Sequence, residues 1–297
     1  MPAEGMDWLP RSELLTFEEI ERIARVFVER FGVDGIRLTG GEPTVRAHLP
    51  VLVGKLATLP IDLSMTTNGA TFRLLAEDLR SAGLGRVNIS LDSLRRERFL
   101  AITRRDELER VLDGIAAAKE AGFDPVKVNV VLERGMNDDE IVDFATWGRE
   151  QGVAVRFIEF MPLDASGAWA RDTVVSQEEI LDAISTVYPL VPAPARGSAP
   201  ADRWLYADGR GDVGIIPSVT KPFCGDCDRI RVTAEGQFRT CLFETREFDL
   251  RALLRTGASD DDLAAEIVRA VGTKWAGHNI GQVSFIRPAR SMSQIGG

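Results

Sequence analysis

The segment G-I-R-L-T-G-G-E-P at residues 35–43 joins a short apolar strand to a pair of glycines. A helix precedes this strand, because Thr16 and Glu19 are spaced as a capping box and apolar residues then recur at helical intervals as far as Phe31. Gly32 follows as a glycine stop. A helix that leads into a strand and a glycine turn is typical of an α/β fold.

The alternation of helix and strand continues outward from this segment to about residue 160. The hydrophobic pattern predicts further helices over 49–59, 74–82, 108–121 and 141–151, and further strands over 61–67, 87–91, 126–132 and 153–160. Five strands separated by helices predict a parallel sheet, which right-handed crossovers curl into a full or partial barrel.

The pattern changes beyond Met161. A capped helix begins at Ser176, and the stretch from 189 to 200, rich in proline and alanine, is predicted to be an exposed connection. Short strand-like pieces and one final helix follow, at 204–206, 213–216, 230–233 and 260–274. We therefore predict a barrel region over residues 1–161 and a C-terminal α+β region over residues 162–297.

Composition and charge restrict the class of protein. The 297 residues are 44% hydrophobic and 27% charged, and the net charge of -9 argues against the broad basic surface of a nucleic-acid-binding protein. No apolar run approaches the ~20 residues that a membrane span requires. Residues 1–5 lack the features of a secretory signal. We therefore expect a cytoplasmic protein with reduced thiols, which suits its odd number of cysteines.

Glycines and polar residues gather where the predicted strands end, which is where ligands bind in parallel α/β folds. Gly40 and Gly41 would let the backbone approach a ligand, Glu42 would present a carboxylate to an amine, and Pro43 would stiffen the turn. Without further context the same four residues are an ordinary strand-ending turn. The other strand-end positions are Thr66–Gly69, Ser90–Ser93, Lys127 with Asn129, and Glu159 with Met161.

The three cysteines are Cys224, Cys227 and Cys241, with the spacing C-x2-C-x13-C. Three thiolates without a fourth predict a metal site with one open position, where a substrate can bind. Structural zinc is an alternative, but it usually needs a fourth ligand, and His48 and His278 are both distant in the sequence. Buried thiols without a metal are another alternative. An iron–sulfur cluster with an open iron fits three thiolates best, although four cysteines are the usual complement.

Two arginines follow the second cysteine. Arg229 and Arg231 continue from Cys227 at every second position of a strand-like run, which places all three side chains on one face. Arginine binds phosphate or a planar acceptor through two hydrogen bonds. A solvated, charged strand edge is the alternative interpretation of the same pair.

The sequence closely resembles the GTP 3',8-cyclase family, the radical S-adenosylmethionine enzymes that begin molybdenum cofactor synthesis. The resemblance covers essentially the whole chain and depends on the order and spacing of several segments together. They are I-R-L-T-G-G-E-P, M-T-T-N-G, V-N-I-S-L-D-S-L, V-K-V-N-V-V, R-F-I-E-F-M, the F-C-x2-C-x-R-x-R…C-L-F block and the final S-x-I-G-G.

The resemblance implies a partial barrel with two [4Fe-4S] clusters at opposite ends of a channel. One cluster cleaves S-adenosylmethionine to a radical that takes a hydrogen from the ribose of GTP, and the resulting carbon radical closes onto C8 of guanine. The three cysteines would hold the second cluster, whose open iron takes the guanine edge. Implied contacts to S-adenosylmethionine are Gly40, Gly41, Glu42, Pro43, Ser90 and Met161, and implied contacts to GTP are Arg37, Thr66, Lys127, Arg229 and Arg231.

The same resemblance implies roles for the tail and for a partner. Gly296 and Gly297 would reach into the active site and act in catalysis together with Arg229 and Arg231. Cyclic pyranopterin monophosphate synthase would use the product. The sequence leaves a homodimer open and predicts neither a nucleic-acid nor a membrane partner.

One feature of the family is missing from the printed sequence. Members bind the first cluster through C-x3-C-x2-C, just upstream of a segment like Met1–Gly5, and the strand that carries this motif is missing with it. We therefore expect these residues alone not to generate a radical. A start-site artefact is our preferred interpretation. A shortened paralogue that binds only GTP and a cluster, or a radical enzyme with another substrate, are the alternatives, and the upstream in-frame DNA distinguishes artefact from paralogue.

Overall fold

A computed structural model describes most of the chain. The described residues are 9–163, 169–195, 197–274, 277, 280, 285–288, 290 and 292–295. None of the helices in this part is long and apolar enough to cross a membrane. Of the predicted site residues, Gly296 and Gly297 lie outside the described residues.

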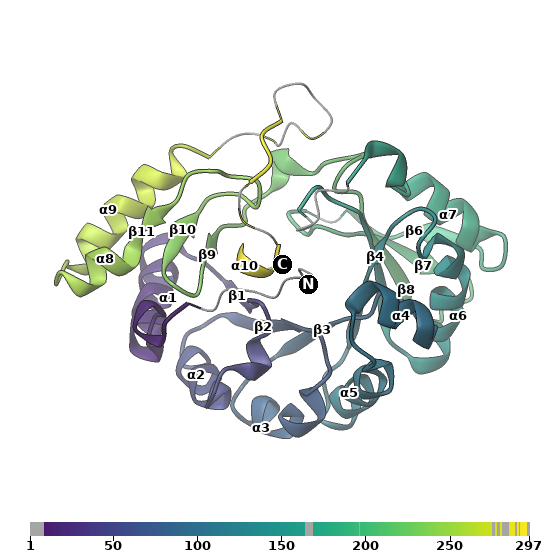
Figure 1. Ribbon diagram of the computed structural model, residues 1–297, viewed down its shortest axis with the longest axis horizontal. Helices are drawn as coiled ribbons and strands as arrows, with labels where there is room; N and C mark the ends of the chain where they lie inside the picture. Colours follow the sequence, from purple (N-terminus) through teal and green to yellow (C-terminus); the bar gives the residue numbers. More distant parts are fainter. Residues whose placement is uncertain are drawn as a thin grey trace.

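One eight-stranded sheet organises the molecule, in the order β1-β2-β3-β4-β5-β8-β7-β6. Neighbouring strands from β1 to β5, and β5 with β8, run parallel, whereas β7 pairs antiparallel with both β8 and β6. Figure 1 shows the sheet as an open crescent with α2, α3, α5 and α6 along its outer side. The predicted partial barrel is therefore confirmed. The strands are β1 (Gly35–Leu38), β2 (Asp62–Thr67), β3 (Arg86–Ser90), β4 (Lys127–Leu132), β5 (Ala154–Glu159), β6 (Leu190–Pro192), β7 (Asp202–Tyr206) and β8 (Asp212–Ile216).

Local capping signals place the helices where the sequence predicts them. Thr16 forms a complete capping box with Glu19 at the start of α1, and Ser176 forms one with Glu179 at the start of α7. Gly32 ends α1 in the left-handed conformation, with φ of 66°. The helices are α1 (Phe17–Phe31), α2 (Leu49–Leu56), α3 (Ala76–Ser81), α4 (Arg96–Thr103), α5 (Leu108–Glu120), α6 (Ile141–Gln151), α7 (Gln177–Ser185), α8 (Leu250–Arg255), α9 (Asp260–Val271) and α10 (Met292–Ile295).

A second, smaller sheet carries the cysteine region. Its strands β9 (Arg231–Val232), β10 (Gln237–Arg239) and β11 (Phe248–Asp249) are antiparallel, with β10 in the middle. The main core fills the space between the large sheet and its outer helices. A separate core packs the small sheet against α1 and α9, with Phe27 and Phe238 in ring contact at 5.5 Å. The cysteine region is therefore attached to the barrel partly through the first long helix.

Two expectations differ from the structure. The stretch 189–200 is not a plain connection, because β6 forms within it as a short edge strand that pairs with β7. The large sheet also continues across residue 161, since β8 joins β5 beyond that position. The sequence did not predict helix α4. Its sequence is highly charged and only Phe99 is buried, so its apolar periodicity is weak.

Candidate active site

The inner face of the crescent is polar because β4 and β5 alternate strictly. In both strands every second residue is buried, which leaves Lys127, Asn129 and Arg156 among those that face the inside. The register places Asn129 beside Arg156 and Asn88 beside Lys127. These side chains therefore form one continuous polar wall.

Several cations of this wall repel one another. Burial and, after it, the charges of Arg156, Arg86 and Arg37 together lower the pKa of Lys127 to about 8, with Asp212 acting in the opposite direction. Burial also lowers the pKa of Arg156 to about 10, with repulsion from Arg37 as the next cause. The pKa of Arg37 is lowered by burial and then by the charges of Arg86 and Arg229. Such an arrangement favours an anionic ligand, because the anion would relieve repulsion and desolvation together.

The cations of this wall do not follow their strands, as the sequence predicted for Lys127, but lie within the strands or at their start. Lys127 is the first residue of β4, and Arg37 and Arg156 lie within β1 and β5. The interpretation of Lys127 as a residue that follows its strand was wrong, because the strand begins at this residue. Arg156 was missed, although an arginine on the inward face of an otherwise apolar strand was a usable signal.

Glu42 joins the ends of neighbouring strands. Its Oε1 accepts hydrogen bonds from the Thr44 backbone N–H at 3.0 Å, the Thr44 hydroxyl at 2.7 Å and the Thr67 hydroxyl at 2.6 Å. Its Oε2 accepts from the Asn68 N–H at 2.7 Å. Oε1 therefore accepts three hydrogen bonds from the protein, whereas Oε2 accepts one. If Glu42 binds an amine, as the sequence predicts, Oε2 is the oxygen that can accept a further hydrogen bond.

Other predicted site residues also lie at the carboxyl ends of the strands, as Glu42 does. Gly40 has φ of 130°, a conformation that favours glycine, and an added Cβ would meet nothing within 4 Å. Ser90 is the last residue of β3, and Met161 follows β5 by two residues. Burial raises the pKa of Asp92 to about 6, against the hydrogen bond from the Val131 N–H. The sequence analysis included Asp92 only as one of the strand-end residues 90–93.

The three cysteines lie on the small sheet and on the loop before it. Cys224 begins the short 3₁₀ helix η6 (Cys224–Asp226), Cys227 follows it, and Cys241 comes two residues after β10. None is in a disulfide. The Phe243 N–H donates to Sγ of Cys241 at 3.5 Å. Within the described ranges no three His, Cys, Asp or Glu side chains are grouped as metal ligands, and this includes the three cysteines, so the cluster that they would hold stays a prediction. His278 lies outside the described residues.

The surroundings of the cysteines suit thiolates. Burial opposes ionisation of Cys227, but the Arg229 backbone N–H and guanidinium outweigh it, so the pKa of Cys227 is lowered. The guanidinium of Arg229 donates to Sγ of Cys227 at 3.5 Å. Lys274 contributes a further positive charge, and its Nζ donates to the carbonyls of Cys227 and Arg229 at 2.9 Å each. Soft, anionic sulfur ligands held among cations fit an iron–sulfur cluster.

The paired arginines connect the cysteines with the cationic wall. The guanidinium of Arg229 lies over the ring of Phe223 at 4.6 Å, and its buried Nε has no partner among the described residues. Burial, followed by the charge of Arg229, lowers the pKa of Arg231 to about 10, while Cys241 and Cys227 act in the opposite direction. Arg229 also lowers the pKa of Arg37, so the two groups of cations are neighbours.

An unsatisfied amide marks the middle of the polar wall. The Asn129 side-chain oxygen is buried without a partner in the described part of the structure. Thr66 lies nearby and accepts from the Asn88 amide at 3.4 Å. Helix α10 lies inside the outline of the crescent in Figure 1, and the Met292 N–H donates to the Leu163 carbonyl at 3.3 Å. The last described segment is therefore joined to the chain that follows β5.

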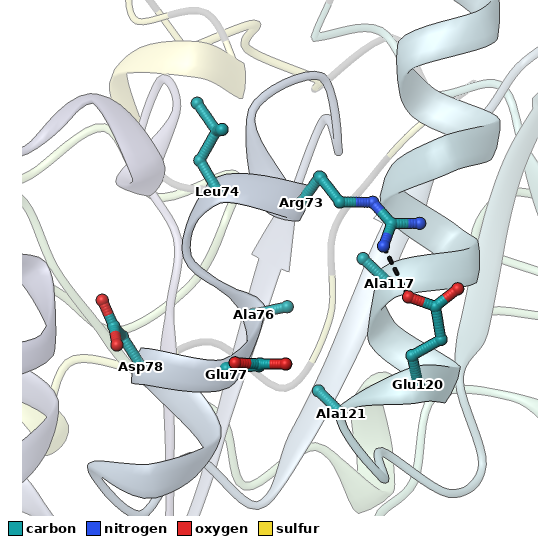
Figure 2. Close-up of a pocket in the computed structure, with 8 residues that line it drawn as sticks. All are labelled: Arg73, Leu74, Ala76, Glu77, Asp78, Ala117, Glu120 and Ala121. Carbon is teal, nitrogen blue, oxygen red and sulfur yellow. Dashed lines mark hydrogen bonds and ion pairs between the residues drawn. The ribbon is translucent and has the colours of Figure 1, made fainter.

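A separate pocket lies among the outer helices. It has a volume of about 310 Å³ between α5 and the segment from η3 (Phe72–Leu74) to α3, and Figure 2 shows Arg73 reaching across it to Glu120. None of the predicted site residues lines it. This pocket is therefore separate from the candidate site.

Comparisons with known proteins agree with this geometry. Residues 5–148 match the radical SAM superfamily, and residues 153–280 match the family described as Molybdenum Cofactor Synthesis C. The chain is 48% identical to the GTP 3',8-cyclase of Streptomyces coelicolor, covering 100% of this chain and 88% of the relative. It is also 48% identical to GTP 3',8-cyclase 2 of Mycobacterium tuberculosis H37Rv, covering 100% and 84%.

A solved structure supports the fold alone. Streptococcus suis SuiB bound to S-adenosylmethionine is similar with a TM-score of 0.54 at 13% identity. The similarity covers 81% of this chain and 58% of that chain. It is consistent with a partial barrel of the radical S-adenosylmethionine type.

Proposed function

The chain belongs to the GTP 3',8-cyclase family of radical S-adenosylmethionine enzymes, and we propose that its crescent binds GTP and S-adenosylmethionine at two levels. The family reaction cyclises GTP to 3',8-cyclo-7,8-dihydro-GTP at the start of molybdenum cofactor synthesis. The observation that carries the GTP assignment is the group of mutually repelling cations on the inner wall. Arg37, Lys127 and Arg156 would bind the triphosphate, since each has a pKa lowered by burial and by neighbouring cations.

The cysteine region would hold the base of the nucleotide. A [4Fe-4S] cluster bound by Cys224, Cys227 and Cys241 would supply an iron with an open position for the guanine edge. Arg229 and Arg231 lie beside these thiols and would hold the nucleotide there. The unpartnered Nε of Arg229 supports this proposal, because it is a buried donor that a ligand would satisfy.

The strand-end level would bind S-adenosylmethionine. When bound together with a second [4Fe-4S] cluster, this cofactor supplies a deoxyadenosyl radical. Gly40 and Gly41 would admit it close to the backbone, and Ser90 and Met161 would contact it from β3 and the end of β5. Pro43 and the hydrogen-bonded Glu42 would fix the turn, and Thr66 would contact GTP from β2.

Iron content and GTP binding test the proposal on the polypeptide of these 297 residues. With three cysteines, it is expected to bind about four irons per chain after anaerobic reconstitution, and added GTP should change the electron paramagnetic resonance spectrum of the reduced cluster. Cys241→Ser should greatly reduce the bound iron. About eight irons would indicate a second cluster. Zinc without iron, or a cluster indifferent to GTP, would refute the assignment of the cysteine region.

GTP affinity is expected to depend on pH through Lys127. Its pKa of about 8 in the ligand-free protein lies below the ordinary 10.5, and a bound triphosphate favours the charged form. Below pH 8 the ammonium is already present, whereas between about pH 8 and 10 binding must take up a proton and weakens by up to about tenfold per pH unit. Titration calorimetry should show this decline, and Lys127→Met should flatten it. An equal decline in both proteins would assign the effect to another group.

The remaining partner assignments stay predictions. Cyclic pyranopterin monophosphate synthase would act on the product of the reaction, and the cytoplasm is the location that suits reduced thiols. A homodimer also stays a prediction.

A further inference from the structure

Glu159 is a fully buried carboxylate with no role in the contacts proposed above. It is the last residue of β5 and has 0% of its surface exposed. Its Oε2 accepts hydrogen bonds from the backbone N–H groups of Val219 and Thr220, both at 2.8 Å. Its Oε1 accepts from the Thr220 hydroxyl at 2.5 Å and from the Gln177 N–H at 3.1 Å. A buried carboxylate with this many donors holds its neighbours firmly in place.

Three of these four hydrogen bonds come from Val219 and Thr220, in the segment that leads into the cysteines, and the fourth comes from Gln177 at the start of α7. Strand β8 ends at Ile216, and Thr220 precedes Cys224 by four residues. Strand β8 lies directly beside β5 through parallel pairing that ends with Ile158 opposite Ile216. Beyond this point no strand pairing joins the two segments in the described structure, and the carboxylate of Glu159 takes over the connection.

The same residue also lies on the strand that carries the other side of the site. Met161 follows Glu159 by two residues at the level proposed for S-adenosylmethionine, and Arg156 precedes it by three on the cationic wall. Glu159 lies on the buried face of the strand, so its carboxylate is turned away from the ligands themselves. It can therefore act only through the segments that it fixes.

We propose that Glu159 is a positioning residue that sets the cysteine loop relative to the cofactor end of β5, and this rests on the function proposed above. Reactive groups displaced by about 1 Å lose activity steeply, so the spacing between radical source and substrate has to be fixed. One carboxylate that binds the loop entering Cys224 and ends the strand leading to Met161 supplies that constraint.

Glu159→Gln tests the proposal, because the amide keeps the shape but turns an NH2 group toward N–H donors. We expect the iron content of the reconstituted chain to stay within about a fifth of the unmodified value. The dissociation constant for GTP should rise about tenfold, and the GTP-induced change in the cluster spectrum should shrink or broaden, because the loop is no longer held in one position. For Glu159→Asp, both the dissociation constant for GTP and the GTP-induced spectral change should lie between those of the unmodified chain and those of Glu159→Gln.

Two control variants separate positioning from stability. Val213→Ala leaves a cavity in β8 and should lower the melting temperature without altering the GTP-induced spectrum. Glu140→Gln changes another fully buried carboxylate, which accepts from Ser93, Leu94 and Arg98, and should likewise leave that spectrum unchanged. If Glu159→Gln fails to fold, Thr220→Val removes only the hydroxyl donor and should weaken GTP binding severalfold.

The outcomes are distinguishable from failure of the proposed function. If the unmodified chain shows no response of the cluster to GTP, the proposed function is wrong. If it responds and both Glu159→Gln and Thr220→Val respond identically with unchanged GTP affinity, the positioning role is wrong. The positioning role is also wrong if Glu159→Gln and Val213→Ala have the same melting temperature and lose the GTP-induced change in the cluster spectrum to the same extent.

Discussion

Arg156→Met is expected to weaken GTP binding by about a hundredfold and at the same time to make the ligand-free protein more stable. Arg156 lies on the inner wall with Arg37 and Lys127, where a triphosphate would accept its hydrogen bonds. A hydrogen bond to a charged group contributes roughly 1.5–3 kcal/mol, so two such bonds account for about a hundredfold in affinity. Titration calorimetry with GTP measures this loss.

The gain in stability follows from the position of the charge. Burial and repulsion from Arg37 lower the pKa of Arg156 to about 10, and Asp212 offsets this only in part. One pKa unit corresponds to about 1.4 kcal/mol, so below pH 10 the charge opposes folding by on the order of 3 kcal/mol. This cost declines only as the pH rises through the range between 10 and 12.5. Methionine removes the charge while filling similar space, and the melting temperature should rise by a few degrees.

Arg110→Met provides the matched control for removal of one arginine. Arg110 lies on α5, its side chain is 65% exposed, and it pairs with Glu107. We expect neither GTP affinity nor melting temperature to change measurably, since exposed pairs contribute little. Unchanged GTP affinity in Arg156→Met would remove this residue from the binding site. A fall in its melting temperature would show that the cationic group is not a source of strain.

Local signals account for most of the fold that could be predicted. The capping boxes at Thr16 and Ser176 and the glycine stop at Gly32 act within a few residues, so the sequence displays them directly. Strand β6 could not be predicted in the same way, because its pairing with β7 is non-local and its sequence contains Pro192. The continuation of the sheet from β5 to β8 depends on a contact between distant segments and is equally hidden.

The sequence indicated which residue types gather at the candidate site, but not where along its strand each residue lies. The cysteine spacing and the pair Arg229 and Arg231 were visible because the residues are close in sequence. Arg156 was not recognised, and Glu159 was named only as a strand-end residue, since the role of each depends on which face of β5 it occupies and on what lies opposite. Lys127 was grouped with the residues that follow their strands, although the predicted strand 126–132 already begins one residue before it, and β4 begins at Lys127 itself. Its role in binding GTP stays a prediction.

The second large effect is expected for Arg231. The charges of Arg229, Cys227 and Cys241 all act on its pKa, so its guanidinium lies near the thiols where, in the proposed function, the guanine end of the nucleotide would meet the cluster. Arg231→Ala should reduce turnover of GTP by about 10²–10³-fold in a version of the protein that carries the C-x3-C-x2-C motif. Cleavage of S-adenosylmethionine without GTP should persist, because the strand-end level is unaltered.

Arg231→Lys separates the two contributions of this side chain. Lysine keeps the positive charge beside Cys227 and Cys241 but lacks the planar fork that arginine offers to a ligand. If the fork matters, the lysine variant should retain its iron yet recover less than about a tenth of the GTP turnover. Full recovery would mean that the charge alone suffices. Equal loss of GTP turnover and of GTP-independent cleavage in Arg231→Ala would count against a substrate-binding role, because a residue at the guanine end has no reason to affect the cofactor end.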